Sequence, residues 1–503
     1  MHSYIISSPN PSNSLLEIEF KIDRIQTNSI EIQLPAWRPG RYELQNFSKN
    51  ILFIKAFSSD GLSIEIQKIS KERWIVKTEG EHEIKIKYAY YAKQMDAGGS
   101  WIDEKMLYIN FINCLLYVEG RIDESCKVNL NLPGNYKIAS GLDFKDNSVV
   151  ANDFFHLTDS PLIASPNIKQ IKYLVEDIKF NIWVQGDFKI DDEEWKEDFE
   201  KFSVVQGRMM NGFPFKHYHF LIILLPYKFY HGVEHHNSTV IVIGNEVDEN
   251  KELLNFDSIY KKDILGICSH ELFHIWNICR IRPKEMLPYD LTKENYFKTG
   301  YIAEGITTYY GDLFLVRSGL WESDEYLQEL SQTFNRHFNI SNHSHQSLIE
   351  SSIDLWVDGY SNGIPNKKVS IYHKGSLVAF ILDMKIRKQT GNKKSLDDVM
   401  RIMWNNYGQT SIGYLHTDYI NIIADFIGDE AAHEYEKVFI SGNTNLLEEL
   451  QEAVNYVGCE IITEVFPLFD GGISIDIKIK KISKPEEIEN LKQWLNIDIL
   501  SNI

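Results

Sequence analysis

The segment His270-Glu-Leu-Phe-His274 decides how this chain is interpreted. It lies in the stretch Lys261–Arg280, whose apolar residues recur with the period of about 3.6 residues that is typical of a helix. Two histidines four residues apart lie on one face of a helix, about 5–6 Å from each other, and can bind one ion together. Glu271 lies about 100° further round that helix, where it can accept a proton from a water at the metal. We therefore expect His270 and His274 to be zinc ligands and Glu271 to be the general base.

A catalytic zinc site needs a third protein ligand besides a water molecule. The later stretch Ile302–Ser318 is also helical in its periodicity, and it carries Glu304 among apolar neighbours. Burying a carboxylate is costly unless a cation meets it, and a metal ion at the two histidines would be that cation. We expect Glu304 to be the third ligand of one zinc ion per chain. The alternative is that both histidines are ordinary core or surface residues and that Glu304 is solvated.

The rest of the chain places this helix in an α+β multidomain protein. Before residue 165, apolar and polar residues alternate, for example in Leu15–Ile22, as they do in the half-buried strands of an antiparallel β-sandwich. Further strands follow up to about Glu246, including His219–Leu225, and the pattern then becomes helical. The helical stretches are Lys261–Arg280, Ile302–Ser318, Glu322–Phe338, Val369–Thr390 and Ser395–Tyr407. We expect an N-terminal β domain (1–165), a mostly helical catalytic domain (166–450) and a short C-terminal appendage (451–503), which includes a strand over 471–479 and a helix over 484–495.

Composition excludes several classes of function. The 503 residues include 52 Lys and Arg against 71 Asp and Glu, a net charge of −19, which disfavours a nucleic-acid or anionic-membrane surface. Five scattered cysteines without a CxxC pair indicate neither a disulfide framework nor a cysteine-rich zinc site. Apolar runs such as Phe220–Leu225 are far shorter than the ~20 residues of a membrane span. Because Met1–Pro9 has no basic start and no apolar core of a secretory signal, we expect a cytoplasmic protein. The sequence does not indicate an oligomeric state.

The run from His270 to Leu313 resembles the M61 metallopeptidases, the glycyl aminopeptidase family. The long segment Ile275–Ala303 between the second histidine and Glu304, with its motifs RIRP (280–283) and ENY (294–296), is of the M61 kind. The segments Leu34–Gly40 and Tyr117–Gly120 extend the resemblance into the N-terminal region. The resemblance implies a gluzincin with a thermolysin-like catalytic domain related to that of the M1 aminopeptidases. It also implies an aminopeptidase that cleaves peptides with a free N-terminus and prefers small N-terminal residues such as Gly or Ala.

The segment His231-Gly-Val-Glu-His235 resembles the GxEH-type strand of this family, in which the Glu binds the α-amino group of the substrate. The resemblance therefore implies that Glu234 binds the substrate amine. His231 stands where the family usually has Gly. We do not expect His235 and His236 to be zinc ligands, because adjacent residues of a strand point to opposite faces.

The segment Tyr372-His-Lys-Gly375 resembles the YxKG helix start of M1 and M61 enzymes. There the tyrosine hydroxyl donates to the oxyanion of the reaction, so the resemblance implies this role for Tyr372. M61 proteins typically end in a PDZ domain, and the 53 residues after Leu450 (451–503) are too few for one, so we expect the PDZ domain to be missing or reduced. Two alternatives stay open, namely a zinc endopeptidase or other hydrolase on the same centre, and a catalytically inactive, peptidase-like binding protein.

Overall fold

The computed structural model describes residues 1–186, 190–245, 258–340, 343–361, 363–365, 367–467, 473–482 and 485–495. The chain forms two compact units. Unit 1 consists of Met1–Ile190, Phe215–Asp257 and Asp290–Glu294, and unit 2 of Asp191–Pro214, Ser258–Tyr289 and Asn295–Ile503. Unit 1 holds the sheets that precede the HExxH helix, and unit 2 holds that helix and those after it. The α+β multidomain fold is confirmed, whereas the domain boundaries at 165 and 450 stay a prediction.

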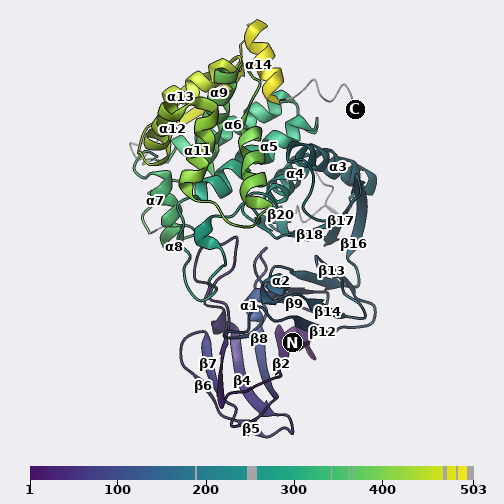
Figure 1. Ribbon diagram of the computed structural model, residues 1–503. Coiled ribbons are helices and arrows are strands. Elements are labelled where there is room, and N and C mark those ends of the chain that lie inside the picture. The colour runs from purple at the N-terminus through teal and green to yellow at the C-terminus, as the bar shows by residue number, and fades with distance from the viewer. Residues whose placement is uncertain are drawn as a thin grey trace. The chain divides into compact units, whose positions relative to one another are not determined.

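The N-terminal part of unit 1 is built from three sheets. Their orders are β14-β12-β1-β2-β8-β4-β5, β11-β3-β7-β6 and β13-β15-β10-β9, and β2, β8 and β4 lie side by side in Figure 1. The strands are β1 (His2–Ser7), β2 (Leu15–Ile22), β3 (Ser29–Gln33), β4 (Ile51–Ser58), β5 (Ser63–Ile64), β6 (Ile66–Lys68), β7 (Arg73–Lys77), β8 (Ile84–Tyr91), β9 (Trp101–Ile102), β10 (Leu107–Ile109), β11 (Tyr117–Val118), β12 (Cys126–Asn131), β13 (Lys137–Ser140), β14 (Ser148–Ala151) and β15 (Leu162–Ser165).

The alternation of the sequence explains these sheets. In β2 the residues Leu16, Ile18, Phe20 and Ile22 are buried, and the polar residues between them lie towards solvent. Nearly all pairs are antiparallel, as predicted, but β1 and β12 run parallel. Two short helices, α1 (Phe111–Cys114) and α2 (Phe154–Thr158), lie between strands.

A five-stranded mixed sheet completes unit 1, in the order β16-β17-β18-β20-β19. Its strands are β16 (Lys169–Val175), β17 (Ile178–Gln185), β18 (His217–Leu225), β19 (Phe229–Glu234) and β20 (Ser238–Gly244). The central strands β17, β18 and β20 are parallel, and β18 is continuously apolar from Phe220 to Leu225 because such strands are buried on both faces. Tyr108 and Ile163 share a core with Leu221, Ile223 and Val240, so the sheet β13-β15-β10-β9 packs on this sheet. The edge strand β19 is antiparallel to β20 and ends at Glu234.

Unit 2 is mostly helical. In the described residues its helices and helical turns are α3 (Asp192–Met209), α4 (Ser258–Phe273), η3 (Lys284–Met286), η4 (Tyr301–Ile306), α5 (Thr307–Arg317), α6 (Ser323–Phe338), α7 (Leu348–Ile353), α8 (Leu355–Asp358), α9 (His373–Thr390), α10 (Leu396–Met403), η5 (Trp404–Gly408), α11 (His416–Ile427), α12 (Asp429–Tyr435), η6 (Glu436–Ile440), α13 (Leu447–Tyr456) and α14 (Pro485–Leu495). Helix α9 lies at the centre and contacts α5, α6, α11 and α13 (Figure 1). Among the described residues, no helix is both long and apolar enough to cross a bilayer.

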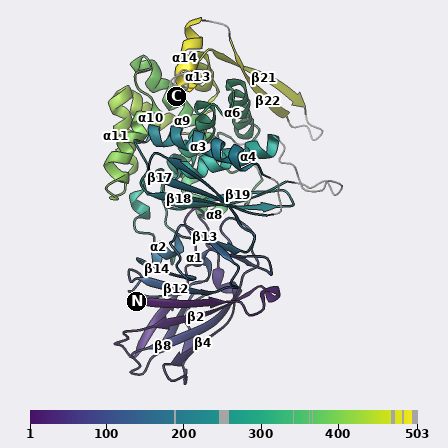
Figure 2. The same ribbon diagram turned by 90° about the vertical axis from the view of Figure 1, so that its right-hand side faces the viewer.

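The strands near the C-terminus pack along α6. The hairpin of β21 (Cys459–Pro467) and β22 (Ile473–Lys481) lies beside this helix (Figure 2). Ser331, Asn335 and Asn339, spaced by four residues, accept hydrogen bonds from every second backbone N–H group of β22, those of Ile479, Ile477 and Ile475, at 2.9, 2.7 and 2.8 Å. Side chains of a helix thus pair the edge of a strand. The predicted strand is present from Ile473, and its first two positions lie outside the described residues.

Helix α14 is held in unit 2 by a fully buried tryptophan. The indole of Trp494 donates to the hydroxyl of Tyr309 at 2.7 Å, and its ring packs edge-on against Tyr326. The guanidinium of Arg317 donates to the backbone carbonyl of Trp494 at 3.2 Å, where a helix end leaves carbonyls without helical partners. The last described residues therefore contribute to the core of unit 2.

Candidate metal centre

The two histidines of the HExxH segment lie at the C-terminal end of α4. Their Nε2 atoms are 3.0 Å apart, and their ring centroids are 4.7 Å apart. The helix predicted to reach Arg280 ends at Phe273, because the chain then turns and places Ile278 at a φ of 95°. A positive φ is unusual for a β-branched residue and marks a constrained turn. His274 therefore lies where the helix passes into this turn.

The predicted third ligand meets the histidines. Glu304 lies in the π-helical turn η4, which precedes α5 without a break, and its side chain is almost completely buried. Its Oε2 atom is 3.3 Å from Nε2 of His274 and 3.9 Å from Nε2 of His270. One ligand atom from each of the three residues lies within 4.8 Å of the others. π-helical turns of this kind occur frequently at functional sites.

The protonation of the two imidazoles suits a metal ion. Nδ1 of His274 is 2.9 Å from the backbone carbonyl of Asn277, which can only accept, so the ring proton is on Nδ1 and Nε2 keeps its lone pair. Burial and the neighbouring His274 lower the pKa of His270 well below 6.5. Two imidazoles and a carboxylate thus bring three electron-pair donors together, and such a set can hold a metal cation. Two nitrogens bound to tetrahedral zinc at ~2.0–2.1 Å would be about 3.3 Å apart, close to the observed separation.

A side chain that was not predicted holds the ligands together. The amide of Asn277 donates to the backbone carbonyls of Ile302 and Ala303 at 2.8 and 3.1 Å, and to Oγ1 of Thr307 at 3.0 Å. Asn277 therefore connects the turn after His274 to the turn that carries Glu304. Metal-binding imidazoles usually need such partners to fix their orientation. In the sequence, the signal for this residue is a lone amide within the apolar run 275–278.

The other two predicted residues of unit 2 lie on elements next to the ligands. Glu271 is buried and adjoins His270 on α4. Tyr372 is the residue before α9 and is half-buried. A Cβ atom on Gly305 would be 2.6 Å from Cα of Gly375, so η4 and the first turn of α9 touch backbone to backbone. The two glycines thereby allow the helix start that follows Tyr372 to pack directly on the turn of Glu304.

The predicted amine-binding residue lies in unit 1. Glu234 is the last residue of β19, and His235 and His236 follow it. Both histidines bind the carboxylate of Asp159, with Nδ1–Oδ distances of 3.0 and 2.5 Å. The expectation that they point to opposite faces is wrong, because the strand ends before them. Burial would raise the pKa of Asp159, but the two histidines outweigh it and hold that pKa below its usual range.

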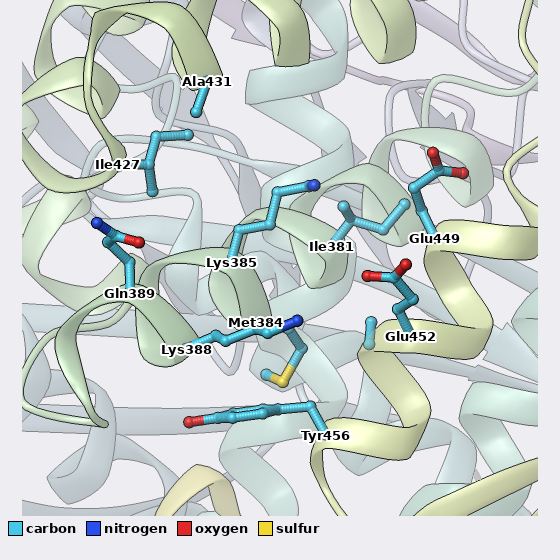
Figure 3. Close-up of a pocket in the computed structure, with 11 residues that line it drawn as sticks. Ile381, Met384, Lys385, Lys388, Gln389, Ile427, Ala431, Glu449, Glu452 and Tyr456 are labelled. Atoms are coloured by element: carbon cyan, nitrogen blue, oxygen red, sulfur yellow. The ribbon is translucent and has the colours of Figure 1, made fainter.

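A hollow elsewhere in unit 2 has a different character. It has a volume of about 230 Å³ and lies between α9, α11, α12 and α13. Figure 3 shows Lys385 and Lys388 on the α9 side, and Glu449 and Glu452 on α13. Its lining includes neither histidine nor cysteine, so this hollow is not a second centre of the kind formed by His270, His274 and Glu304.

Known proteins and protein families resemble the chain over most of its length. Residues 3–166 match the family profile of the peptidase M61 N-terminal domain, and residues 263–378 match that of the M61 glycyl aminopeptidases. An aminopeptidase N family protein from Idiomarina loihiensis is 28% identical, with a TM-score of 0.85 over 94% of this chain and 81% of that chain. An M1 zinc metallopeptidase from Deinococcus radiodurans shares the fold, at 12% identity and a TM-score of 0.52 over 88% of this chain and 94% of that one.

A search of curated proteins by sequence found no match. Both family profiles name the M61 peptidases, one for the N-terminal β region and one for the region of the HExxH segment. The similar solved structure from Idiomarina loihiensis is likewise that of an aminopeptidase N family protein. The chain therefore belongs to the M61 family of peptidases, the family of the glycyl aminopeptidases.

Proposed function

We propose that this protein is a zinc-dependent aminopeptidase that hydrolyses the N-terminal peptide bond of peptides and favours small N-terminal residues such as Gly or Ala. The observation that carries the proposal is the convergence of His270, His274 and Glu304 on one point. Two relatives support the substrate class, because one is an aminopeptidase N family protein and a variant of the Deinococcus enzyme was solved with a Tyr-Ser-Ala substrate.

The three ligands would hold one zinc ion per chain. Two imidazole nitrogens and one carboxylate oxygen are a ligand set of catalytic zinc sites, which keep the fourth position for water or substrate. When bound, the ion supplies a Lewis acid that polarises the water and the peptide carbonyl. Burial, and then the neighbouring His274, lower the pKa of His270, which keeps its ring nitrogen available for the ion.

The remaining residues have distinct roles in this proposal. Glu271 accepts the proton of the attacking water and passes it to the leaving amine. The hydroxyl of Tyr372 donates to the oxyanion, a contribution of about 3 kcal/mol for a positioned donor. The carboxylate of Glu234 binds the α-ammonium group of the substrate, so that cleavage occurs one residue from the N-terminus.

The proposal is tested with a glycyl reporter substrate, its N-acetylated form, and metal analysis of the purified protein. We expect stoichiometric zinc, hydrolysis of the free-amine form only, loss of activity with a chelator, and recovery with added zinc. Equal rates on both substrates would favour an endopeptidase or other hydrolase. Absence of both zinc and turnover would favour an inactive binding protein.

The variant Glu271→Gln tests the role of the general base. We expect it to retain zinc and to lose about 10²–10⁴-fold in kcat, because the amide has the same shape but cannot take up the proton. The matched control is Glu193→Gln on the exposed first turn of α3, which should leave both quantities unchanged. Full activity of Glu271→Gln would rule out this mechanism.

A further inference from the structure

The carboxylate of Glu234 lies against a glycine from the N-terminal β region. A Cβ atom on Gly40 would be 2.8 Å from Oε2 and 3.2 Å from Oε1 of Glu234, and 3.2 Å from Cγ1 of Val233. Gly40 also has a φ of +78°, which side-chain-bearing residues rarely adopt. The space that the carboxylate occupies therefore exists because residue 40 has no side chain.

The loop that carries Gly40 is held rigidly. The indole of Trp37 donates to the carbonyl of Asp290 at 2.7 Å, and the backbone N–H of Ala36 donates to the carbonyl of Leu291 at 2.8 Å. The guanidinium of Arg38 is buried against Gly98, where an added Cβ atom would be only 2.0 Å from its carbon. This loop, Ala36–Gly40, therefore has little freedom to move away from Glu234.

The end of strand β19, which carries Glu234, is held as well. Asp159 binds both histidines that follow Glu234, and it also accepts the backbone N–H of His236 at 3.1 Å. On β19 itself, the backbone N–H of Ala97 donates to Nδ1 of His231 at 3.3 Å. Asp159, Ala97 and Gly40 all come from residues 3–166, the region that matches the M61 N-terminal profile. The N-terminal region thus positions Glu234 from several directions.

We propose that Gly40 is a specificity-determining residue, and that the loop Ala36–Gly40 forms one wall of the subsite for the α-ammonium group of a peptide substrate. This inference rests on the proposed role of Glu234. A side chain at position 40 forces the carboxylate to rotate or shift, because neither the loop nor the strand end can yield. The negative charge then no longer lies where it pairs with the substrate ammonium. Selection for a free N-terminus is in this way built into the N-terminal β region.

The test compares Gly40→Ala with Gly120→Ala. Gly120 has nearly the same φ, +76°, in the same unit, but nothing lies within 4 Å of its added Cβ atom, so the two variants share the backbone strain and differ in the collision. We expect Gly40→Ala to raise KM for the glycyl reporter about tenfold to a hundredfold, the effect of losing one charge-assisted hydrogen bond, with kcat changed much less. Gly120→Ala should leave KM unchanged, and zinc content should stay the same in both.

A double-mutant cycle with Glu234→Ala identifies the cause. In that background Gly40→Ala should have no further effect on KM, because the carboxylate it would collide with is absent. Gly40→Ala can also lower the melting temperature more than Gly120→Ala does. In that case the double variant with Gly40→Ala and Glu234→Ala should regain the extra loss of melting temperature. The contact is therefore tested even when the single variant is unstable.

The outcomes separate this inference from the proposed function. Equal KM values for Gly40→Ala and Gly120→Ala, or an effect of Gly40→Ala that persists in Glu234→Ala, would overturn the inference. If Glu234→Ala still distinguishes the free amine from the acetylated substrate, the role of Glu234 itself is wrong. If Glu234→Ala loses that discrimination while Gly40→Ala keeps it, only the inference about the loop fails.

Discussion

Replacing Asn277 by alanine tests what holds the proposed metal centre together. The side-chain amide of Asn277 makes three hydrogen bonds of 2.8–3.1 Å to Ile302, Ala303 and Thr307, and its backbone carbonyl accepts from His274 at 2.9 Å. One residue thus connects the second histidine to the turn that carries Glu304. Asn277→Ala keeps the backbone carbonyl and removes the three side-chain bonds, so it loosens the position of Glu304 and leaves all three ligands in place.

The magnitude follows from these contacts. The amide has two N–H groups shared among the three acceptors, and each buried hydrogen bond contributes about 1 kcal/mol, so the free energy of unfolding should fall by about 2 kcal/mol. Loss of a partner that orients metal ligands typically weakens metal binding by about 10–100-fold. Because the groups that do the chemistry are unchanged, kcat at saturating zinc should recover most of its original value.

The assay combines three measurements on wild type and variant, namely denaturant unfolding, zinc affinity by competition with a chelator, and activity against free zinc. Asn490→Ala is the control, since its amide donates to the carbonyl of Tyr456 on α13, at another place in unit 2. That variant should lose stability and keep its zinc affinity. An Asn277→Ala protein that binds zinc as tightly as wild type would refute the reasoning, even if its stability falls as calculated.

Three further predictions concern single side chains. Tyr372→Phe should lower kcat about 100-fold with little change in KM, measured by steady-state kinetics on the glycyl reporter, and a rise in KM alone would contradict its role. Trp494→Ala should lower the free energy of unfolding by about 3–5 kcal/mol, because it empties a fully buried site; unchanged urea unfolding would show that α14 is dispensable. Burial, and then Lys374, lower the pKa of His337 to about 3, so between pH 6.5 and 3 the unfolded chain binds a proton that the folded one excludes. The free energy of unfolding should therefore fall from pH 7 to pH 5, by about 2 kcal/mol for this residue. Its dependence on pH should be weaker in His337→Phe, as measured by chemical denaturation at several pH values. An equal pH dependence in wild type and variant would contradict this.

The sequence predicted those parts of the fold that depend on local pattern. Alternation in Leu15–Ile22 predicted a strand with one buried face, and the structure confirms it. The segment Ser395–Asp398 has the spacing of a capping box, and that box is present at the start of α10. The four-residue spacing of His270 and His274 predicted that their rings meet, and they do. Each of these features follows from the geometry of a single strand or helix turn.

The limits of the local pattern are visible at the ends of the elements. The periodicity of Lys261–Arg280 continues past Phe273, but the helix stops there because Asn277 bonds to η4 and its neighbour Ile278 adopts a positive φ. The short helices α1 and α2 have too few turns to show a helical period. In such places the structure is decided by partners that are distant in the sequence.

The sequence by itself determined which residue types are available for chemistry and which face of each element is apolar, since both depend on residues only a few positions apart. Only the tertiary structure decided which distant segments meet. It brought Glu304 to the two histidines, placed Gly40 against the carboxylate of Glu234, and buried Trp494 beside Tyr309. The physical reason is that local sequence leaves an apolar face to be covered or, at a glycine, a space to be filled. Which distant group covers or fills it is decided only when the complete chain packs closely.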